Sequence, residues 1–374
     1  MSKTKIPENV IRQLLINSGG RCEYRGCNEH LFKDLITKNR FNFSYIAHIV
    51  ADSENGPRGD RSRSEKLKKD ISNLMLLCDK HHRLIDKENV EGHPESLLVE
   101  MKKEHEDRIE RLTAIQPERH SHIVTYFVNI GEHTPNITFE QAANYLLPDF
   151  YPATSGLIEL ATTNSPIKDN DVTFWETELQ ILQKNFHEKL QDLLRNKRIK
   201  HISLFALAPM PLLIKLGTLI NDIQNIEIHQ PRRTPKTWNL SNDLIKEDYK
   251  IIRPKKSYKI VALNISLSAT IDNKRIEKVL GKEISIYTIR IKEPFNDFLK
   301  SKYQVYDFAN HIRKLFDEIK LKYNEETKLH IFPAMPVALA IELGRVWMPK
   351  ADMPLVIYDQ NKKLNGFTKT IEIC

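Results

Sequence analysis

The sequence predicts two domains of different fold class: an α+β domain with a metal site over residues 1–118, and an α/β domain with two repeated lobes over residues 119–374. Three observations support this division. The chain has 374 residues, which exceeds the ~100–200 residues of one ordinary domain. Three of its four cysteines lie in the first 80 residues, near histidines. A strand–helix pattern occurs twice after residue 200.

The composition excludes several classes of protein. With 40% hydrophobic and 28% charged residues, the chain is globular rather than disordered. No apolar run approaches the ~20 residues that span a bilayer, and the N-terminus lacks a signal-peptide core. We therefore expect a cytoplasmic protein, in which four cysteines form no disulfide framework. The net charge of +8 is spread along the chain and is explained by solubility alone.

Apolar spacing predicts the elements of the first domain. Ile6, Val10 and Leu14 fall on one face of an opening helix that Gly19 ends. We expect a strand within residues 41–50, and then a Gly- and Pro-containing basic loop over residues 53–69. An apolar strand that ends at Cys78 comes next, then a helix start, and finally a long helix from Pro94 to about Gln116.

An internal repeat predicts the second domain. Residues 201–217 align without gaps onto residues 328–344, and six of the 17 positions are identical, among them Gly217 and Gly344. Each copy reads as a strand, a Pro-containing turn and an apolar helix, preceded by an amphipathic helix and followed by another strand. This is the pattern of a parallel sheet, so we expect two tandem α/β lobes. Chance similarity of two apolar segments is the alternative.

Two short-spaced pairs have the spacing of a structural zinc site. Cys22 and Cys27 are separated by four residues, and Cys78 and His81 by two. Zinc prefers four tetrahedral sulfur and nitrogen ligands, which two such pairs can supply from two segments of chain. Free buried cysteines beside a surface histidine are the alternative.

Between and beside these pairs lie His48, Asn73 and His82. The motifs RCEYRGC, AHIV and NLMLLCDKHH resemble, in order and spacing, those of the HNH (His-Me finger, ββα-metal) nucleases. The resemblance covers about residues 10–90, with His81 in the place of the last zinc-binding cysteine. It implies that His48 is the catalytic histidine, that His82 binds a catalytic divalent ion and that Asn73 holds the loop and the His48 strand in place.

The chemistry of phosphodiester hydrolysis explains these residue types. A neutral imidazole can take a proton from water near pH 7, so His48 is the expected general base. A divalent ion, Mg²⁺ or another such as Mn²⁺, neutralises charge on the phosphate and the leaving oxygen. Many HNH nucleases place a metal ligand directly before the catalytic histidine, where this chain has Ala47. Asp86, four residues after His82, is our candidate replacement, and Asp52 is a weaker one.

The loop between residues 58 and 69 is locally basic. Six lysines and arginines, including Arg58, Arg61 and Arg63, stand there against Asp60 and Glu65. Contact with DNA phosphates is one interpretation, and a solvated loop is the other.

Duplicated α/β lobes behind an N-terminal nuclease resemble the SAVED domain, a fusion of two CARF-like (Rossmann-like) subunits that senses cyclic oligonucleotides in bacterial CBASS anti-phage systems. The resemblance implies lobes at about 119–250 and 251–374. Ligands of α/β sheets collect at the carboxyl ends of the strands. The ligand-contact candidates near those ends, each with core packing or plain surface as its alternative, are Pro209, Met210, Arg232, Arg233, Trp238, Pro336, Arg345, Trp347 and Tyr358.

These inferences predict an endonuclease that degrades double-stranded DNA when a cyclic di- or trinucleotide activates it, with association into a dimer or tetramer on activation. The main alternative is an HNH restriction endonuclease whose C-terminal domain recognises specific or modified DNA. A zinc-braced DNA-binding module with a degenerate nuclease is a third reading, against which the presence of His48, Asn73 and His82 argues.

Overall fold

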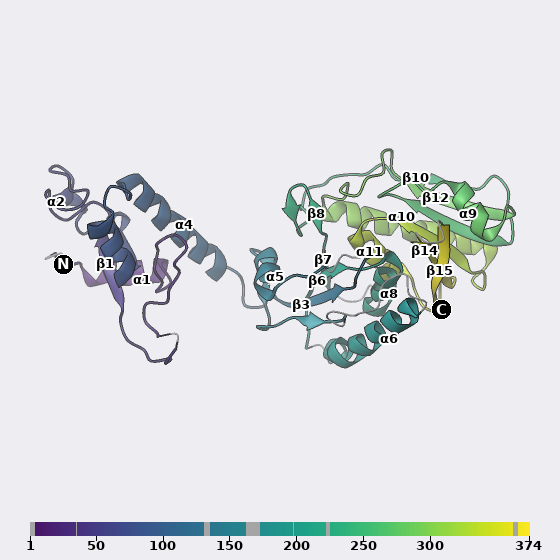
Figure 1. Cartoon of the computed structure of the whole chain (residues 1–374), viewed down its shortest axis with the longest axis horizontal. Helices are drawn as coiled ribbons and strands as arrows, with labels where there is room; N and C mark the ends of the chain where they lie inside the picture. Colours follow the sequence, from purple (N-terminus) through teal and green to yellow (C-terminus); the bar gives the residue numbers. More distant parts are fainter. Residues whose placement is uncertain are drawn as a thin grey trace. The chain divides into compact units, whose positions relative to one another are not determined.

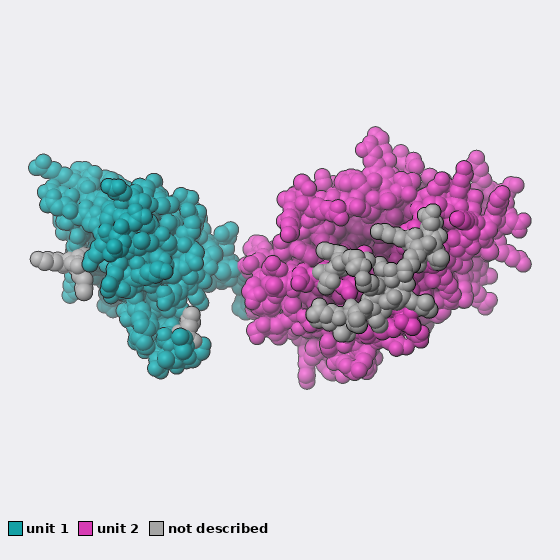
Figure 2. All heavy atoms as spheres, in the orientation of Figure 1, with its two compact units in different colours: residues 1–117 teal, residues 118–374 magenta. Residues whose placement is uncertain are grey.

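A computed structural model describes residues 4–34, 36–130, 135–161, 173–196, 198–221, 225–361 and 366–374. The chain divides into two compact units between Pro117 and Glu118, one residue before the boundary that the sequence predicts (Figure 2). Unit 1 comprises residues 1–117 and unit 2 comprises residues 118–374. In the part of the chain that is described, no helix is both long and apolar enough to cross a membrane.

Unit 1 is built on one antiparallel strand pair and three longer helical segments. Its elements are α1 (Glu8–Asn17), β1 (Ser44–His48), α2 (Ser64–Leu67), the 3-10 helix η1 (Ile71–Asn73), β2 (Leu74–Cys78), α3 (Asp79–Arg83), the π-helix η2 (Leu84–Glu88) and α4 (Glu95–Thr113). Strands β1 and β2 pair so that His48 lies opposite Leu74 and Ser44 lies opposite Cys78. Because the two strands are antiparallel, the end of β1 lies beside the start of β2. Helix α3 follows β2 directly.

The core of unit 1 fixes β2 and the helix after it. All five residues of β2 are buried, and Leu14 of α1 and Leu98 of α4 pack with them in one cluster. Ile85 of η2 belongs to the same cluster. Because fully burying one such side chain stabilises a fold by ~1.5–3 kcal/mol, this small core sets the positions of the polar residues at its margin.

The first lobe of unit 2 is a parallel sheet with helices. Its strands are β3 (His120–Phe127), β4 (Tyr151–Pro152), β5 (Ile158–Glu159), β6 (Ile202–Leu207) and β7 (Ile226–His229), in the order β4-β3-β6-β7 with β5 also on β3. Its helical segments are α5 (Phe139–Leu146), α6 (Phe174–Phe186), η3 (His187–Gln191), α7 (Asp192–Arg195) and α8 (Met210–Ile220). A two-strand hairpin, β8 (Arg232–Arg233) and β9 (Lys236–Thr237), follows.

The second lobe is a six-stranded mixed sheet. Its strands are β10 (Lys250–Ile252), β11 (Ile260–Ser266), β12 (Ile284–Arg290), β13 (Leu329–Ala334), β14 (Leu355–Asn361) and β15 (Gly366–Ile373), in the order β10-β12-β11-β13-β14-β15. The four central strands are parallel, and the two edge strands run antiparallel. Its helices are α9 (Asn273–Leu280), α10 (Lys302–Tyr323) and α11 (Val337–Val346).

The structure confirms the predicted repeat. Strands β6 and β7 are parallel neighbours joined through α8, and β13 and β14 are parallel neighbours joined through α11. The predicted amphipathic helices are α6 and α10, which bury Phe186 and Phe316 among others. The antiparallel edge strands β10 and β15 were not predicted, because their short runs lie outside the repeated segment.

Helices α8 and α11 join the two lobes. They lie between the two sheets of unit 2 (Figure 1), and no other pair of described elements has a larger contact. A Cβ atom on Gly217 would stand 2.0 Å from the carbonyl oxygen of Ile341, and one on Gly344 would stand 1.9 Å from that of Ile214. These positions correspond in the repeat, so the contact is reciprocal, and glycine is needed on both helices for their backbones to approach this closely.

Candidate metal centre and nuclease-like site

The four predicted zinc ligands meet in unit 1. The candidate ligand atoms of Cys22, Cys27, Cys78 and His81 all lie within 4.8 Å of one another. His81 Nδ1 is 3.1 Å from Cys78 Sγ and 3.6 Å from Cys22 Sγ. The first pair comes from the turn after α1, while Cys78 ends β2 and His81 lies in α3.

This donor set fits zinc. Ligand atoms ~2.0–2.3 Å from a tetrahedral ion stand about 3.3–3.8 Å apart. The two distances from His81 Nδ1 to the sulfur atoms, 3.1 and 3.6 Å, are close to this range. Burial raises the pKa of the Cys22 and Cys78 thiols and lowers the pKa of His81. A bound cation offsets the cost of forming buried thiolates, because metal binding displaces their protons.

Two residues that sequence reasoning missed support this centre. The ring of Tyr24 stacks on His81, with centroids 4.1 Å apart and planes within 1°. The Tyr24 hydroxyl is 3.0 Å from His93 Nε2, and His93 Nδ1 is 2.7 Å from the carbonyl oxygen of Asn89. Together they restrict the orientation of the imidazole that would bind the metal.

His48 ends β1 and has a fixed tautomer. The residue is only 8% exposed, and its Nε2 lies 3.0 Å from the carbonyl oxygen of Lys68. A carbonyl oxygen can only accept a hydrogen bond, so Nε2 carries the proton of the neutral ring. Nδ1 is then the nitrogen whose lone pair can accept a proton.

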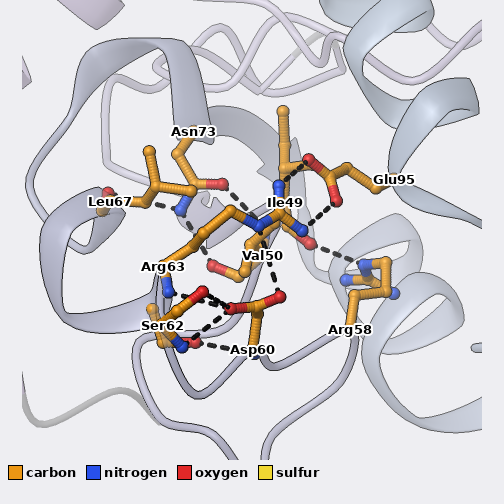
Figure 3. Close-up of polar contacts among 10 residues, drawn as sticks. Ile49, Val50, Arg58, Asp60, Ser62, Arg63, Leu67, Asn73 and Glu95 are labelled. Carbon is orange, nitrogen blue, oxygen red and sulfur yellow. Dashed lines mark hydrogen bonds and ion pairs between the residues drawn. The ribbon is translucent and has the colours of Figure 1, made fainter.

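Asn73 holds the segment after His48. Its Nδ2 donates to the carbonyl oxygen of Val50 at 2.8 Å and to that of Leu67 at 3.3 Å, while its Oδ1 accepts from the backbone N–H of Val50 at 2.8 Å (Figure 3). Ile49 also donates its backbone N–H to the carbonyl oxygen of Asn73. One buried amide thus closes the loop that starts at Val50 and returns at Leu67.

His82 and Asp86 lie together, as their spacing predicts. His82 Nε2 is 3.3 Å from Asp86 Oδ2, and the His82 ring stacks on Tyr45 of β1 with centroids 5.0 Å apart. Burial raises the pKa of Asp86, but hydrogen bonds from His82 and Arg58, together with the charge of Arg58, outweigh it, and the pKa lies below its usual value. Asp86 is therefore an ionised oxygen donor beside an imidazole nitrogen.

The structure distinguishes the two candidates, Asp86 and Asp52, for the metal ligand that is missing at Ala47. Ala47 is buried in the core and offers no donor. Asp52 accepts a hydrogen bond from Thr4 at 2.8 Å. Of the two candidates, only Asp86 contacts His82 in the residues that the structure describes.

The three arginines of the basic loop differ sharply. Arg61 is exposed, with 94% of its side chain accessible. Arg63 makes a bidentate ion pair with Glu95 (2.8 Å) and also contacts Asp60 at 3.3 Å (Figure 3). The side chain of Arg58 is only 8% accessible, and its guanidinium contacts groups of the protein itself. This corrects the interpretation of Arg58 as a surface phosphate contact.

In unit 2, three of the ligand candidates lie where the strands of the two lobes end. Pro209 and Met210 begin α8 directly after β6, and Pro336 precedes α11 directly after β13. Gln230, which follows β7, accepts a hydrogen bond from the Ala338 N–H of α11 at 2.9 Å. This bond between the lobes brings their carboxyl edges to the same side of unit 2.

Arg345 and Tyr358 do not belong to that edge. Arg345 lies near the end of α11, ~12 Å along the helix from its start. There it lines a pocket of about 370 Å³ together with His201 and Ile226, which stand where β6 and β7 begin. Tyr358 is 5% exposed and stacks on Phe332 inside the second lobe. Both predictions of a ligand contact at the carboxyl edge are wrong for these two residues.

Of the other aromatic and basic candidates, Trp347, Trp238 and Arg232 are packed against the protein, whereas Arg233 is exposed. Trp347 is buried and donates its indole N–H to the carbonyl oxygen of Met353, so it is also a core residue. Trp238 is partly buried, with its ring against Phe127 and Phe205. Arg232 and Arg233 form the short strand β8, where Arg232 Nε lies 4.0 Å from Asp297.

Unit 2 is thus an α/β domain of two lobes in one chain, each with parallel central strands, whose carboxyl edges face the same side. A family model described as "SMODS-associated and fused to various effectors sensor domain", or SAVED, matches residues 182–373. That match covers more than half of the chain, which therefore belongs to the SAVED family. No curated protein matches the chain in sequence.

Several solved structures resemble the chain distantly. A Cap4 SAVED/CARF-domain containing receptor from Acinetobacter baumannii with the cyclic trinucleotide 2'3'3'-cAAA is 11% identical, with a TM-score of 0.42 over 74% of this chain and 55% of that chain. The same receptor with 3'3'3'-cAAA gives 12% identity, a TM-score of 0.43, and 74% and 62% coverage. The Moraxella osloensis Cap4 receptor gives 10% identity, a TM-score of 0.39, and 75% and 60% coverage. The chain spans less than two thirds of each of these proteins.

Proposed function

We propose that the protein is a metal-dependent endonuclease that cleaves double-stranded DNA in bacterial anti-phage (CBASS) defence, and that a cyclic oligonucleotide activates it. Membership of a family of sensor domains fused to effectors supports the sensing part. The nuclease part is supported by unit 1, an HNH-like arrangement of two strands and a helix. The observation that carries it is the contact between His48 Nε2 and the Lys68 carbonyl, which leaves Nδ1 as the proton acceptor.

The residues of unit 1 have distinct roles in this proposal. His48 Nδ1 takes a proton from water as the water oxygen bonds to phosphorus and the bond to the 3′ oxygen breaks, a contribution of ~10²–10⁴-fold. His82 and Asp86 hold a divalent ion, Mg²⁺ in the simplest case. When bound, that ion stabilises negative charge on the phosphate and the leaving oxygen. Asn73 keeps the loop after His48 closed through its bonds to Val50.

Zinc has a structural role in the proposal. Four protein ligands complete a tetrahedral site and leave no open position for water, which is the pattern of structural rather than catalytic zinc. Cys22 and Cys78 then tie the turn after α1 to the end of β2, the strand that pairs with the one carrying His48.

Unit 2 binds the activator at the shared carboxyl edge of its lobes. Helices α8 and α11 both begin at this edge, after Pro209 and Pro336, and the positive ends of their dipoles favour phosphate groups there. Binding promotes association of the protein and so brings two nuclease units to one duplex. A shift of the associated fraction from 1:99 to 99:1 requires ~5.5 kcal/mol of differential binding.

The test is a plasmid cleavage assay with Mg²⁺ and a panel of cyclic di- and trinucleotides, followed in parallel by light scattering. We expect double-strand cleavage with one or a few members of the panel, accompanied by an increase in mass. His48→Ala must abolish cleavage while zinc content and nucleotide binding are retained. Cleavage of modified DNA without any nucleotide supports the restriction-type alternative instead, and cleavage at unchanged mass rules out activation by association.

A further inference from the structure

The loop between β1 and η1 places a buried cation next to the nuclease-like site. Arg58 has a positive φ of 54°, a conformation that residues with a side chain rarely adopt. It stands between Pro57, whose carbonyl oxygen accepts from the Ala51 N–H, and Gly59. A Cβ on Gly59 would lie 2.5 Å from the carbonyl oxygens of Ser53 and Glu54, so the turn depends on glycine there.

The turn directs the Arg58 guanidinium into the protein, where it contacts two separate elements. On the β1 side, Nε lies 2.6 Å from the carbonyl oxygen of Ile49 and Nη2 lies 3.5 Å from that of His48 (Figure 3 draws the first contact). On the η2 side, Nη1 lies 2.7 Å from the carbonyl oxygen of Ile85 and Nη2 lies 2.8 Å from Asp86 Oδ1. Each of its three nitrogens has at least one protein acceptor.

The two carboxylate oxygens of Asp86 have different partners. Oδ1 accepts from Arg58, and Oδ2 faces His82 Nε2 at 3.3 Å. One oxygen is therefore anchored, and the other is held beside the second donor of the proposed metal site. The same guanidinium contacts the backbone of His48, so one side chain connects the proposed base to the proposed metal ligands.

We propose that Arg58 is a positioning residue: it orients Asp86 toward the catalytic divalent ion and fixes the distance between that ion and His48. This role rests on the proposed nuclease function, in which Asp86 replaces the metal ligand missing at Ala47 and Arg58 holds Asp86 in place. Arg58 acts through Asp86 and His48 and does not touch DNA. Its planar fork suits several acceptors at once, whereas a lysine ammonium keeps the charge but loses this geometry.

The decisive variant is Arg58→Lys in the full chain. Because outer partners of metal ligands change affinity or activity by ~10–100-fold, we expect Mn²⁺ affinity of the zinc-loaded protein, measured by electron paramagnetic resonance without DNA or activator, to fall by about 10-fold. The Mg²⁺ concentration for half-maximal cleavage should rise in parallel. We expect kcat at saturating Mg²⁺ to fall by up to ~10²-fold, as displacements of about 1 Å do.

Loss of folded protein alone lowers the active fraction but leaves the metal dissociation constant of the remaining fraction unchanged. The metal titration therefore distinguishes a folding defect from loss of the positioning role. Arg12→Lys is the matched control, since Arg12 is an exposed residue of α1 paired with Glu8. DNA affinity and its salt dependence should be unchanged in Arg58→Lys. A smaller salt dependence with normal metal affinity identifies a phosphate contact and overturns the proposal.

Measurements on the wild-type protein distinguish failure of the Arg58 role from failure of the nuclease proposal. If it binds Mn²⁺ and cleaves DNA, but Arg58→Lys matches it in metal affinity and kcat, the positioning role is wrong and the nuclease remains. If the wild type neither binds Mn²⁺ at a second site nor cleaves DNA with any member of the nucleotide panel, the nuclease proposal fails and the role of Arg58 fails with it.

Discussion

The contact between α8 and α11 makes a sharp prediction about Gly217→Ala. The added Cβ would stand 2.0 Å from the Ile341 carbonyl oxygen, whereas non-bonded heavy atoms settle at ~3.5 Å. The helices must separate by about 1.5 Å, in a region where gaps of 0.5–1 Å already lose a quarter to a half of the attraction between atoms. We take ~3 kcal/mol for this overpacking and subtract ~1 kcal/mol for the better helix propensity of alanine. The expected net loss is about 2 kcal/mol.

Tryptophan fluorescence during urea unfolding can measure this loss, because all three tryptophans, Trp175, Trp238 and Trp347, lie in unit 2. For a unit of this size, 2 kcal/mol corresponds to a fall of ~4–8 °C in Tm. The control is Gly156→Ala, where a Cβ meets no atom within 4 Å and the backbone φ is not positive. It should be neutral or slightly stabilising.

Reciprocity gives the prediction a second requirement. Gly344→Ala would place its Cβ 1.9 Å from the Ile214 carbonyl oxygen and should cost about as much as Gly217→Ala. Once one substitution has separated the helices, the second meets less resistance, so the double variant should cost less than the sum by at least ~0.5 kcal/mol. Unchanged stability of Gly217→Ala, or a gain of ~1 kcal/mol as propensity alone predicts, refutes the close helix contact.

Three further perturbations address the metal centre, the loop and the sensor unit. Cys78→Ser should lower zinc content and destabilise unit 1, as seen by faster proteolysis; a soluble, zinc-free variant that keeps any unit 1 activity contradicts the four-ligand site. Asn73→Ala leaves the backbone groups of Val50 unpaired and should cost ~2–4 kcal/mol, with Asn73→Asp intermediate because it keeps the acceptor; equal melting of all three proteins excludes this role. Burial lowers the pKa of His201 and His229 to about 4, below the unfolded value near 6.5. Their contribution to the free energy of unfolding is therefore complete above pH 6.5 and is lost as the pH falls toward 4. Urea unfolding followed by tryptophan fluorescence should show up to ~3 kcal/mol of loss per histidine over that range, and a flat profile rejects the assignment.

The sequence predicted those parts of the structure that depend on local spacing. Cys22 and Cys27 belong to one turn, and Cys78 and His81 flank one helix start, so two local pairs needed only to meet. The strands expected within residues 201–217 and 328–344 are β6 and β13, because the repeated apolar pattern marks both of them. Whether zinc, Mg²⁺ and DNA bind remains a prediction.

What the sequence could not predict depends on contacts between distant residues. The stacking of Tyr45 on His82 requires the register of β1 and β2, and the stacking of Tyr24 on His81 requires the turn after α1 to meet α3. No single-sequence pattern specifies either contact. Arg58 looked like its exposed neighbour Arg61, because only the left-handed turn at residue 58 directs it inward. Tyr358 was expected near the carboxyl end of a strand, but pairing with β15 continues β14 past it to Asn361.

The joining of both lobes in one polypeptide has a consequence in mass action. Two separate subunits related by the Gly217–Gly344 contact would exchange and would come apart on dilution, whereas partners tethered in one chain meet at a high effective concentration. The shared carboxyl edge of the two lobes is therefore present at any protein concentration. Because α8 and α11 already cover each other, any concentration-dependent assembly of this protein must use a different surface.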